Sequence, residues 1–158
     1  MARTTAAGGC RTGMRVSEAM TRDICVCGPD ESIRDCAQAM RRNDIGALPV
    51  AENNLLIGMV TDRDIAVRAT AAGKGPDTPV REVLSREVLF CYDDQDLAHV
   101  AESMGLAKIR RVPVLRRDRR MVGMLSLADV ARASADAAGG TLAALSQRGG
   151  PHSQVPAT

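Results

Sequence analysis

The sequence predicts a mixed α/β (α+β) fold made of two copies of one unit, in which strands and helices follow the order β-α-β-β-α. Three observations predict it: a repeat that spans most of the chain, an alternation of short apolar runs with helical patterns, and two matching strand-to-helix corners. Each half of the 158-residue chain has about 60 residues, which is too few to bury a comfortable core alone. The two halves are therefore expected to pack face to face.

The repeat keeps one register through each half. With an offset of 64 residues, identical residues pair as Val16 and Val80, Glu18 and Glu82, Arg22 and Arg86, Cys27 and Cys91, Ala37 and Ala101, Met40 and Met104, Ile45 and Ile109, Pro49 and Pro113, and Val50 and Val114. After the second hairpin turn, which is one residue longer, the offset is 65, and the pairs are Gly58 and Gly123, Met59 and Met124, Asp64 and Asp129, and Ala66 and Ala131. Chance does not keep one register over such a length, so the pattern indicates a duplication.

Each element of the first half has a local signal. The expected order is a lead-in helix, a strand, a helix, two strands and a helix, at 16–20, 24–27, 33–42, 47–50, 55–60 and 61–72. Ser32 caps the longer helix, with Asp35 three residues on, and its apolar residues recur at helical spacing. Glu52-Asn53-Asn54 forms the turn between the paired strands.

Four segments follow from this order. Residues 1–15 are expected to be disordered, 16–75 and 76–138 to form the first and second repeats, and 139–158 to be a flexible tail in which Leu142 and Leu145 could form one docked turn. The linker Gly73–Pro79 is short and rich in proline, so it should keep the repeats close together.

Composition excludes several classes of function. The net charge of +2 is too small to favour nucleic acids or membranes, and the chain has only one Tyr, one Phe and no Trp, so it lacks the aromatic platforms of single-strand binders. No apolar run reaches the ~20 residues of a membrane helix.

The odd number of cysteines is typical of a reduced, cytoplasmic protein. Cys25 and Cys27 have strand spacing, which predicts buried thiols; a metal site that includes them, or Cys91, is the alternative.

The first strand-to-helix corner carries the candidate chemistry. Thr61 stands at the helix N-cap and Asp64 at the third helical position, which predicts at least a capping box. The same corner would suit a nucleotide, because a helix N-terminus favours phosphate and a carboxylate can accept two hydrogen bonds from a ribose diol. Arg63 is a candidate phosphate donor. The residues expected to form an apolar slot for the base, with accessible backbone at its edge, are Ile45, Gly46, Ala47 and Pro49.

The two halves together resemble a tandem pair of cystathionine-β-synthase (CBS) domains, a Bateman module. The resemblance covers about Val16 to Ala135 and is carried by the motifs VSEAMT, DIGALPV and GMVTDRD at their spacing. It implies two repeats related by a pseudo-twofold axis, and a homodimer that pairs through helix faces such as 65–72 and 130–138. Proteins of this kind occur stand-alone in bacteria, and some are associated with stress.

The resemblance also implies roles for single residues. In family members with this corner, the aspartate binds ribose hydroxyls and the serine or threonine binds phosphate, which places Thr61 with Asp64, and Ser126 with Asp129, in two ligand sites. Arg110 and Arg111, just before the strand that contains Pro113, would contact phosphate; a solvated charge pair is the alternative. The first half has no charge at the matching positions, and the second corner has no arginine, so the two sites should differ.

The expected function is therefore regulatory: binding of an adenosine-type nucleotide (AMP, ADP or ATP) between the repeats, without catalysis and without a further cofactor, to signal to an unidentified downstream protein. An enzyme is disfavoured, because a dehydrogenase barrel needs about 250 residues and no Cys–His or Ser–His pairing is suggested. A scaffold that binds no nucleotide, or a metal-binding module, stays open as an alternative. An S-adenosylmethionine or NAD sensor is a further one.

Overall fold

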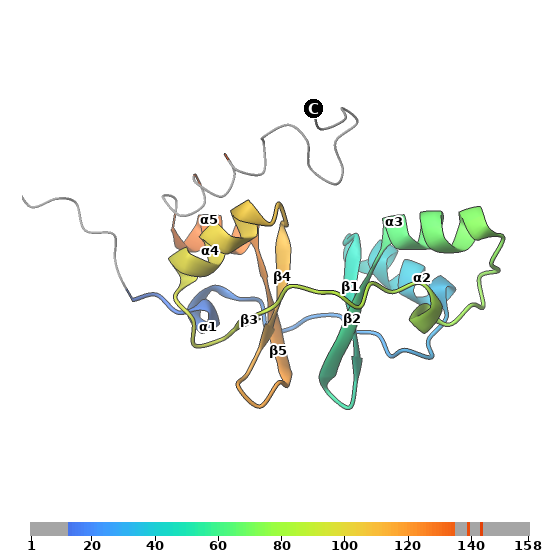
Figure 1. Ribbon diagram of the computed structural model, residues 1–158, viewed down its shortest axis with the longest axis horizontal. Helices are drawn as coiled ribbons and strands as arrows, with labels where there is room; N and C mark the ends of the chain where they lie inside the picture. The colour runs from blue at the N-terminus through green and yellow to red at the C-terminus, as the bar shows by residue number, and fades with distance from the viewer. Residues whose placement is uncertain (1–12, 135–138, 140–142, 144–158) are drawn as a thin grey trace, which may run out of the picture. The chain divides into compact units, whose positions relative to one another are not determined.

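The computed structural model describes residues 13–134, together with 139 and 143 (Figure 1). Its helices are α1 (Val16–Ala19), α2 (Ile33–Asn43), α3 (Asp62–Asp64), the π-helix η1 (Ile65–Ala69), the 3₁₀ helices η2 (Thr70–Ala72) and η3 (Val80–Glu82), α4 (Leu97–Leu106) and α5 (Leu127–Ala133). Its strands are β1 (Ala47–Glu52), β2 (Leu55–Thr61), β3 (Cys91–Tyr92), β4 (Arg111–Leu115) and β5 (Met121–Ser126). The mixed helix and strand content and the two repeats predicted from the sequence are confirmed, although the first strand expected at 24–27 is not regular. The predicted tail with Leu142 and Leu145, and most of the N-terminal segment, lie outside the described residues.

The chain divides into two compact units that do not follow the repeat boundaries. Within the described residues, unit 1 comprises 13–21, 91–112 and 125–134, and unit 2 comprises 22–90 and 113–124. The lead-in helix α1 therefore belongs with the helices of the second repeat, and the tip of the second hairpin belongs with the first repeat.

Unit 2 is built on the antiparallel hairpin β1–β2. Its register pairs Ala47 with Thr61, and an irregularity lies between Val50 and Ala51. Asn53 and Asn54 form the turn with φ of 52° and 64°, the left-handed conformation that a two-residue hairpin turn requires and that asparagine tolerates best after glycine.

One face of this hairpin is covered by helices. In Figure 1, α2 and the helical stretch that begins with α3 lie on the same side of β1 and β2. Ser32 caps α2 by accepting a hydrogen bond from the Asp35 N–H at 3.1 Å, as predicted. The core buried between them contains Cys27, Ile33, Cys36, Ala39, Met40, Leu48, Val50, Val60, Ala69, Val80, Val83 and Leu84.

The predicted strand at 24–27 is wrong except at its last residue. Cys27 forms one isolated parallel bridge with Val50: its N–H donates to the Pro49 carbonyl at 3.0 Å, and its carbonyl accepts from Ala51 N–H at 3.0 Å. The next bond towards Cys25 would need an N–H from Pro49, which proline lacks. The segment is therefore extended without forming a regular strand.

The predicted single helix at 61–72 is continuous but irregular. After one α-helical turn it widens into the π-helix η1 and ends in the 3₁₀ helix η2. Arg68, in η1, donates to the carbonyls of Val83 and Leu84 at 3.3 and 3.2 Å. These bonds hold the wide turn against a distant segment, which no local helix signal could predict.

Unit 1 gathers α1, α4 and α5, which lie together in Figure 1. Asp96 caps α4 by accepting from His99 N–H at 3.1 Å. Strands β3, β4 and β5 form a three-stranded sheet in that order. Buried apolar residues of this unit include Val16, Leu97, Val100, Ala101, Met104, Val112, Leu125 and Val130.

Candidate functional site

The first corner is a reciprocal capping box at the start of α3. The Thr61 hydroxyl accepts from Asp64 N–H at 3.0 Å, and Asp64 Oδ2 accepts from Thr61 N–H at 2.9 Å. The other carboxylate oxygen, Oδ1, lies 3.6 Å from Nε of Arg68, one turn further along. The Asp64 side chain is 14% exposed, so one of its oxygens is held by the backbone and the other faces a solvent-accessible guanidinium.

The second corner repeats this geometry with more partners. Ser126 Oγ accepts from Asp129 N–H at 3.1 Å, and Asp129 Oδ2 accepts from Ser126 N–H at 2.8 Å and from the Ser126 hydroxyl at 2.7 Å. Asp129 Oδ1 accepts from Thr21 Oγ1 at 3.3 Å and pairs with Arg132. Asp129 is only 4% exposed. Its carboxylate is thus enclosed by the unit, whereas that of Asp64 is less enclosed.

Each corner lies beside the backbone that precedes its hairpin. Asp62 N–H donates to the Gly46 carbonyl at 3.0 Å, and Leu127 N–H donates to the Arg110 carbonyl at 2.9 Å. These are equivalent positions in the two repeats. The structure therefore brings the predicted base-edge segment next to the first corner, and the predicted phosphate arginines next to the second.

A hollow of about 530 Å³ opens beside the first corner. It is lined by Ala37, Met40, Arg41, Asp44, Ile45, Gly46, Asp62, Ile65, Ala66 and Thr70. A Cβ on Gly46 would stand 3.0 Å from the Asp62 carboxylate, so a larger residue would crowd it. The hollow contains two of the predicted slot residues, Ile45 and Gly46, but not Thr61 or Asp64.

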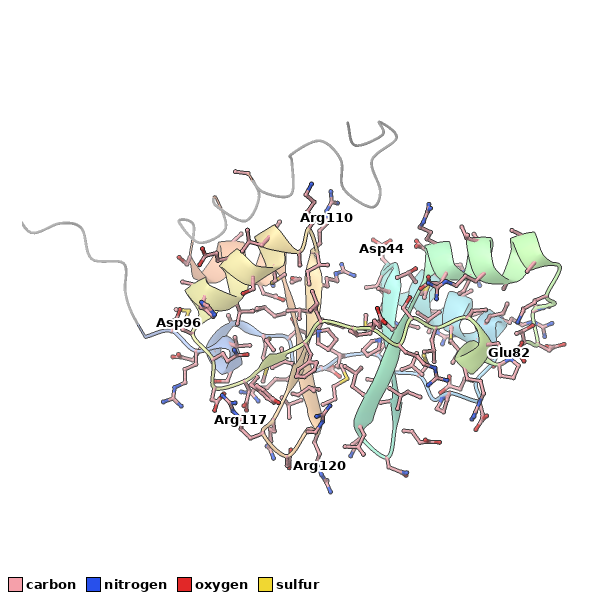
Figure 2. All side chains as sticks on the ribbon, viewed as in Figure 1. Asp44, Glu82, Asp96, Arg110, Arg117 and Arg120 are labelled. Carbon is pink, nitrogen blue, oxygen red and sulfur yellow. The ribbon has the colours of Figure 1, made fainter. Side chains whose placement is uncertain are left out.

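The other predicted residues differ in accessibility. Pro49 and Pro113 are buried within β1 and β4, while Ala47 is half-buried opposite Thr61. Arg63 is exposed, and its N–H donates to Asp62 Oδ1 at 2.7 Å. Arg110 and Arg111 are exposed, and Figure 2 shows the side chain of Arg110 pointing outwards from the start of β4.

The sequence alone did not assign a role to four residues that lie at the corners. Arg68 and Arg132 follow Asp64 and Asp129 by four and three residues, a spacing that brings side chains together on a helix and could have been noticed. Asp62 was visible as part of the motif but was given no role. Thr21 reaches Asp129 over 108 residues of chain, and no local pattern signals such a contact.

The four described cysteines, Cys25, Cys27, Cys36 and Cys91, are free thiols. Cys27 and Cys36 lie in the core of unit 2, where a hydrogen bond to the Cys36 sulfur and burial both raise the pKa of the Cys27 thiol. Burial, assisted by Asp93, raises the pKa of Cys91 to about 12. The environment of Cys27 and Cys91 is that of unreactive core residues, while Cys25 is half-buried. Cys10 lies outside the described part of the chain.

The described residues contain neither a cluster of metal-ligating side chains nor a membrane-spanning helix. Within them, no three His, Cys, Asp or Glu side chains are grouped so that they could hold a metal ion. None of the helices that the structure describes has the length and apolar character needed to cross a membrane.

Two stretches of the sequence, residues 16–69 and 80–136, each match the sequence model of the CBS domain family. A similar relative is the CBS domain-containing protein YhcV of Bacillus subtilis (strain 168), 36% identical over 135 residues, which are 84% of this chain and 96% of YhcV.

Similar solved structures include both metal-bound and ligand-bound proteins. Hypoxic Response Protein I, with two coordinated zinc ions, has a TM-score of 0.69 and 33% identity, covering 75% of this chain and 98% of that one. CBSX2 in complex with AMP has a TM-score of 0.68 and 26% identity, and the match covers 78% of this chain and 98% of CBSX2. The CBS domain pair of MJ0100, in complex with 5-methylthioadenosine and S-adenosyl-L-methionine, has a TM-score of 0.66 and 27% identity, covering 76% and 94%.

Proposed function

Because the chain belongs to the CBS-domain family, as a tandem pair of such domains, we propose that it is a regulatory protein that binds an adenosine-type nucleotide at its strand-to-helix corners and catalyses no reaction. AMP, ADP and ATP are the proposed ligands. A second copy of the chain and an unidentified downstream protein are the proposed partners, and the cytoplasm is the proposed location.

The observation that carries the proposal is the duplicated corner. In both repeats a hydroxyl and a carboxylate flank the first helical turn, and that turn donates a hydrogen bond to the backbone just before the hairpin. The proteins of similar structure that contain AMP or S-adenosylmethionine support an adenosine moiety as the common feature of the ligand.

The capping boxes are compatible with binding. An ionised carboxylate has about four acceptor positions, and the hydrogen bond from Thr61 N–H to the Asp64 carboxylate occupies Oδ2. Oδ1 lies 3.6 Å from Arg68 Nε, beyond hydrogen-bond distance, so it can accept from a ribose hydroxyl while Arg68 keeps its bonds to the Val83 and Leu84 carbonyls. The Arg63 guanidinium is exposed at the same turn, and it is the proposed partner of the phosphate.

The first corner should bind more tightly than the second. Asp129 Oδ1 already has Thr21 and Arg132 as partners, and the residue is almost fully buried. A ligand there would have to replace the partners of a buried carboxylate, whereas Asp64 Oδ1 has no hydrogen bond to lose within the described residues. Arg110 and Arg111 remain the proposed phosphate contacts of this second site.

The test is a thermal-shift titration of the full chain with AMP, ADP, ATP, S-adenosylmethionine and NAD. A ligand at 100 times its Kd should stabilise the folded state by about 2.7 kcal/mol. Asp64→Ala should abolish most of the shift. Asp35→Ala is the matched control, because Asp35 has the same third helical position on α2 and its Oδ2 accepts from the Ser32 hydroxyl at 2.7 Å. Each variant removes one hydrogen bond between a carboxylate and its N-cap residue, which costs about 1 kcal/mol.

The outcomes separate binding from mere capping. If Asp64→Ala and Asp35→Ala give the same ligand-induced shift, the assignment of Asp64 to the ribose is refuted. If no nucleotide shifts the melting temperature of the unaltered protein, the alternative of a scaffold whose carboxylates serve only as helix caps is favoured.

A further inference from the structure

We propose that a second hollow in unit 2, at the turn end of the β1–β2 hairpin, binds an amphipathic anion: an apolar body that carries one carboxylate or sulfonate group. This hollow shares no lining residue with the one beside the first corner. The proposal is therefore independent of the proposed nucleotide function.

The hollow has the size and the walls of a small-molecule site. Its volume is about 530 Å³, within the range of roughly 300 to 1,000 Å³ common for ligand pockets. Three segments that are distant in sequence line it: Leu55, Leu56, Ile57 and Gly58 of β2; Arg86, Val88 and Phe90; and Leu115, Asp118 and Arg119 of the second hairpin. Apart from one aspartate and two arginines, the lining side chains are hydrocarbon.

The charge of the rim is positive. Asp118 is neutralised locally by Arg120, whose N–H donates to Oδ1 at 3.1 Å and whose Nε lies 3.9 Å from Oδ2. Arg86 and Arg119 therefore decide the sign of the charge at the rim. The hairpin tip adds Arg116. Figure 2 shows Arg117 and Arg120 at this tip.

Arg119 is held in place by the turn and by an aromatic ring. Its N–H donates to the Arg116 carbonyl at 2.8 Å, and its φ of 68° is left-handed, a conformation that an L side chain adopts only at an energetic cost. The guanidinium carbon lies 5.9 Å from the centroid of the Phe90 ring. A guanidinium that lies over a ring at this distance still presents N–H groups in its plane, where they can bind a carboxylate with two hydrogen bonds.

The lining favours a simple amphipathic anion over a nucleotide or a peptide. No neutral polar side chain lines the hollow, so the base edge and sugar hydroxyls of a nucleotide, or the amides of a peptide, would be buried with few partners. An aliphatic or aromatic body needs no such partners. One anionic group would then accept hydrogen bonds from the lining arginines, Arg86 and Arg119.

The experiment uses the fluorescent anion 8-anilinonaphthalene-1-sulfonate on the full chain, with octanoate as a competitor. We expect saturable fluorescence that octanoate displaces and that AMP does not. Arg119→Gly should weaken binding at least about tenfold. Because glycine adopts a φ near 68° without strain, this variant should keep the turn and fold at least as well. Phe90→Leu, which keeps the wall apolar but removes the stacking ring, should weaken binding several-fold.

Arg116→Ala is the matched control, since it removes the same charge from the same turn but does not line the hollow. It should bind both anions within about twofold of the unaltered protein, as expected for an exposed charge outside the site. Equal binding by Arg119→Gly and Arg116→Ala would overturn the proposal. So would the failure of octanoate to displace the fluorophore. Asp64→Ala should leave the fluorescence titration unchanged, so a failure of the nucleotide proposal would be seen separately.

Discussion

Replacement of Gly58 by alanine should destabilise the fold strongly, because β2 passes very close to the segment after η3 at this position. A Cβ there would lie 2.5 Å from Leu84 Cδ1 and 2.6 Å from the Ser85 carbonyl oxygen. Leu84 could change its rotamer, but the Ser85 carbonyl belongs to the backbone. It accepts from Met59 N–H at 2.9 Å, and Ser85 N–H donates back to Met59 at 2.8 Å.

The magnitude follows from what must move. Overpacking of a buried position costs about 1–3 kcal/mol, and weakening the two bonds between Met59 and Ser85 adds about 1 kcal/mol. The sum, about 2–4 kcal/mol, is a large share of the 5–15 kcal/mol typical of a domain. For a chain of this size it corresponds to a fall in melting temperature of very roughly 5–15 °C.

Urea unfolding followed by far-UV circular dichroism would measure the effect. Gly75→Ala is the control, because a Cβ at Gly75 would meet nothing within 4 Å, and its stability should stay within about 0.5 kcal/mol of the unaltered protein. If Gly58→Ala were as stable as Gly75→Ala, the close approach of Ser85 to β2 would be refuted.

Two further predictions concern the first hairpin and the buried thiol of Cys91. Asn54→Gly should keep the stability of the protein or raise it by up to about 1 kcal/mol, and Asn54→Val should lower it by about 1–2 kcal/mol. The reason is the φ of 64° at residue 54, which glycine adopts without strain and a β-branched residue does not. Thermal melting of the two variants measures the difference, and equal stabilities would contradict the turn geometry. The pKa of Cys91, raised to about 12 in the folded state, means that the folded protein keeps a proton that the unfolded chain loses near pH 8.5. This contribution to stability is constant below that pH and falls by up to about 1.4 kcal/mol per pH unit above it. Between pH 7.5 and pH 10, the free energy of unfolding of Cys91→Ala should therefore fall by about 2 kcal/mol less than that of the unaltered protein, as measured by urea titrations at each pH. Identical pH profiles would place Cys91 in an accessible position instead.

At the two strand-to-helix corners, some contacts could be predicted from the sequence and others could not. The spacing of Thr61 and Asp64 predicted a capping box, and the reciprocal bonds between them confirm it. The ligand roles of the two residues remain a proposal. The same spacing at Ser126 and Asp129 gave no hint that Thr21 would enclose the second carboxylate.

The segment before α2 shows why a strand pattern can mislead. The alternation of Ile24 to Cys27 fits a strand, and Cys27 does pair with β1. A regular strand, however, needs N–H groups on its neighbour as well as the right side chains. Pro49 on the neighbouring strand has none to offer, so the pairing ends after one bridge.

The sequence by itself determined the duplication, the elements of each repeat apart from the strand expected at 24–27, the hairpin turn and the helix caps, because these depend on periodicity and on residues three or four positions apart. The tertiary structure decided which aspartate is enclosed, which arginines pair with the carboxylates, and where a cationic hollow with apolar walls lies. Burial and charge pairing join segments that are far apart along the chain, as when residues 86–90, β2 and the second hairpin line one hollow. Such properties become visible only when the chain is folded.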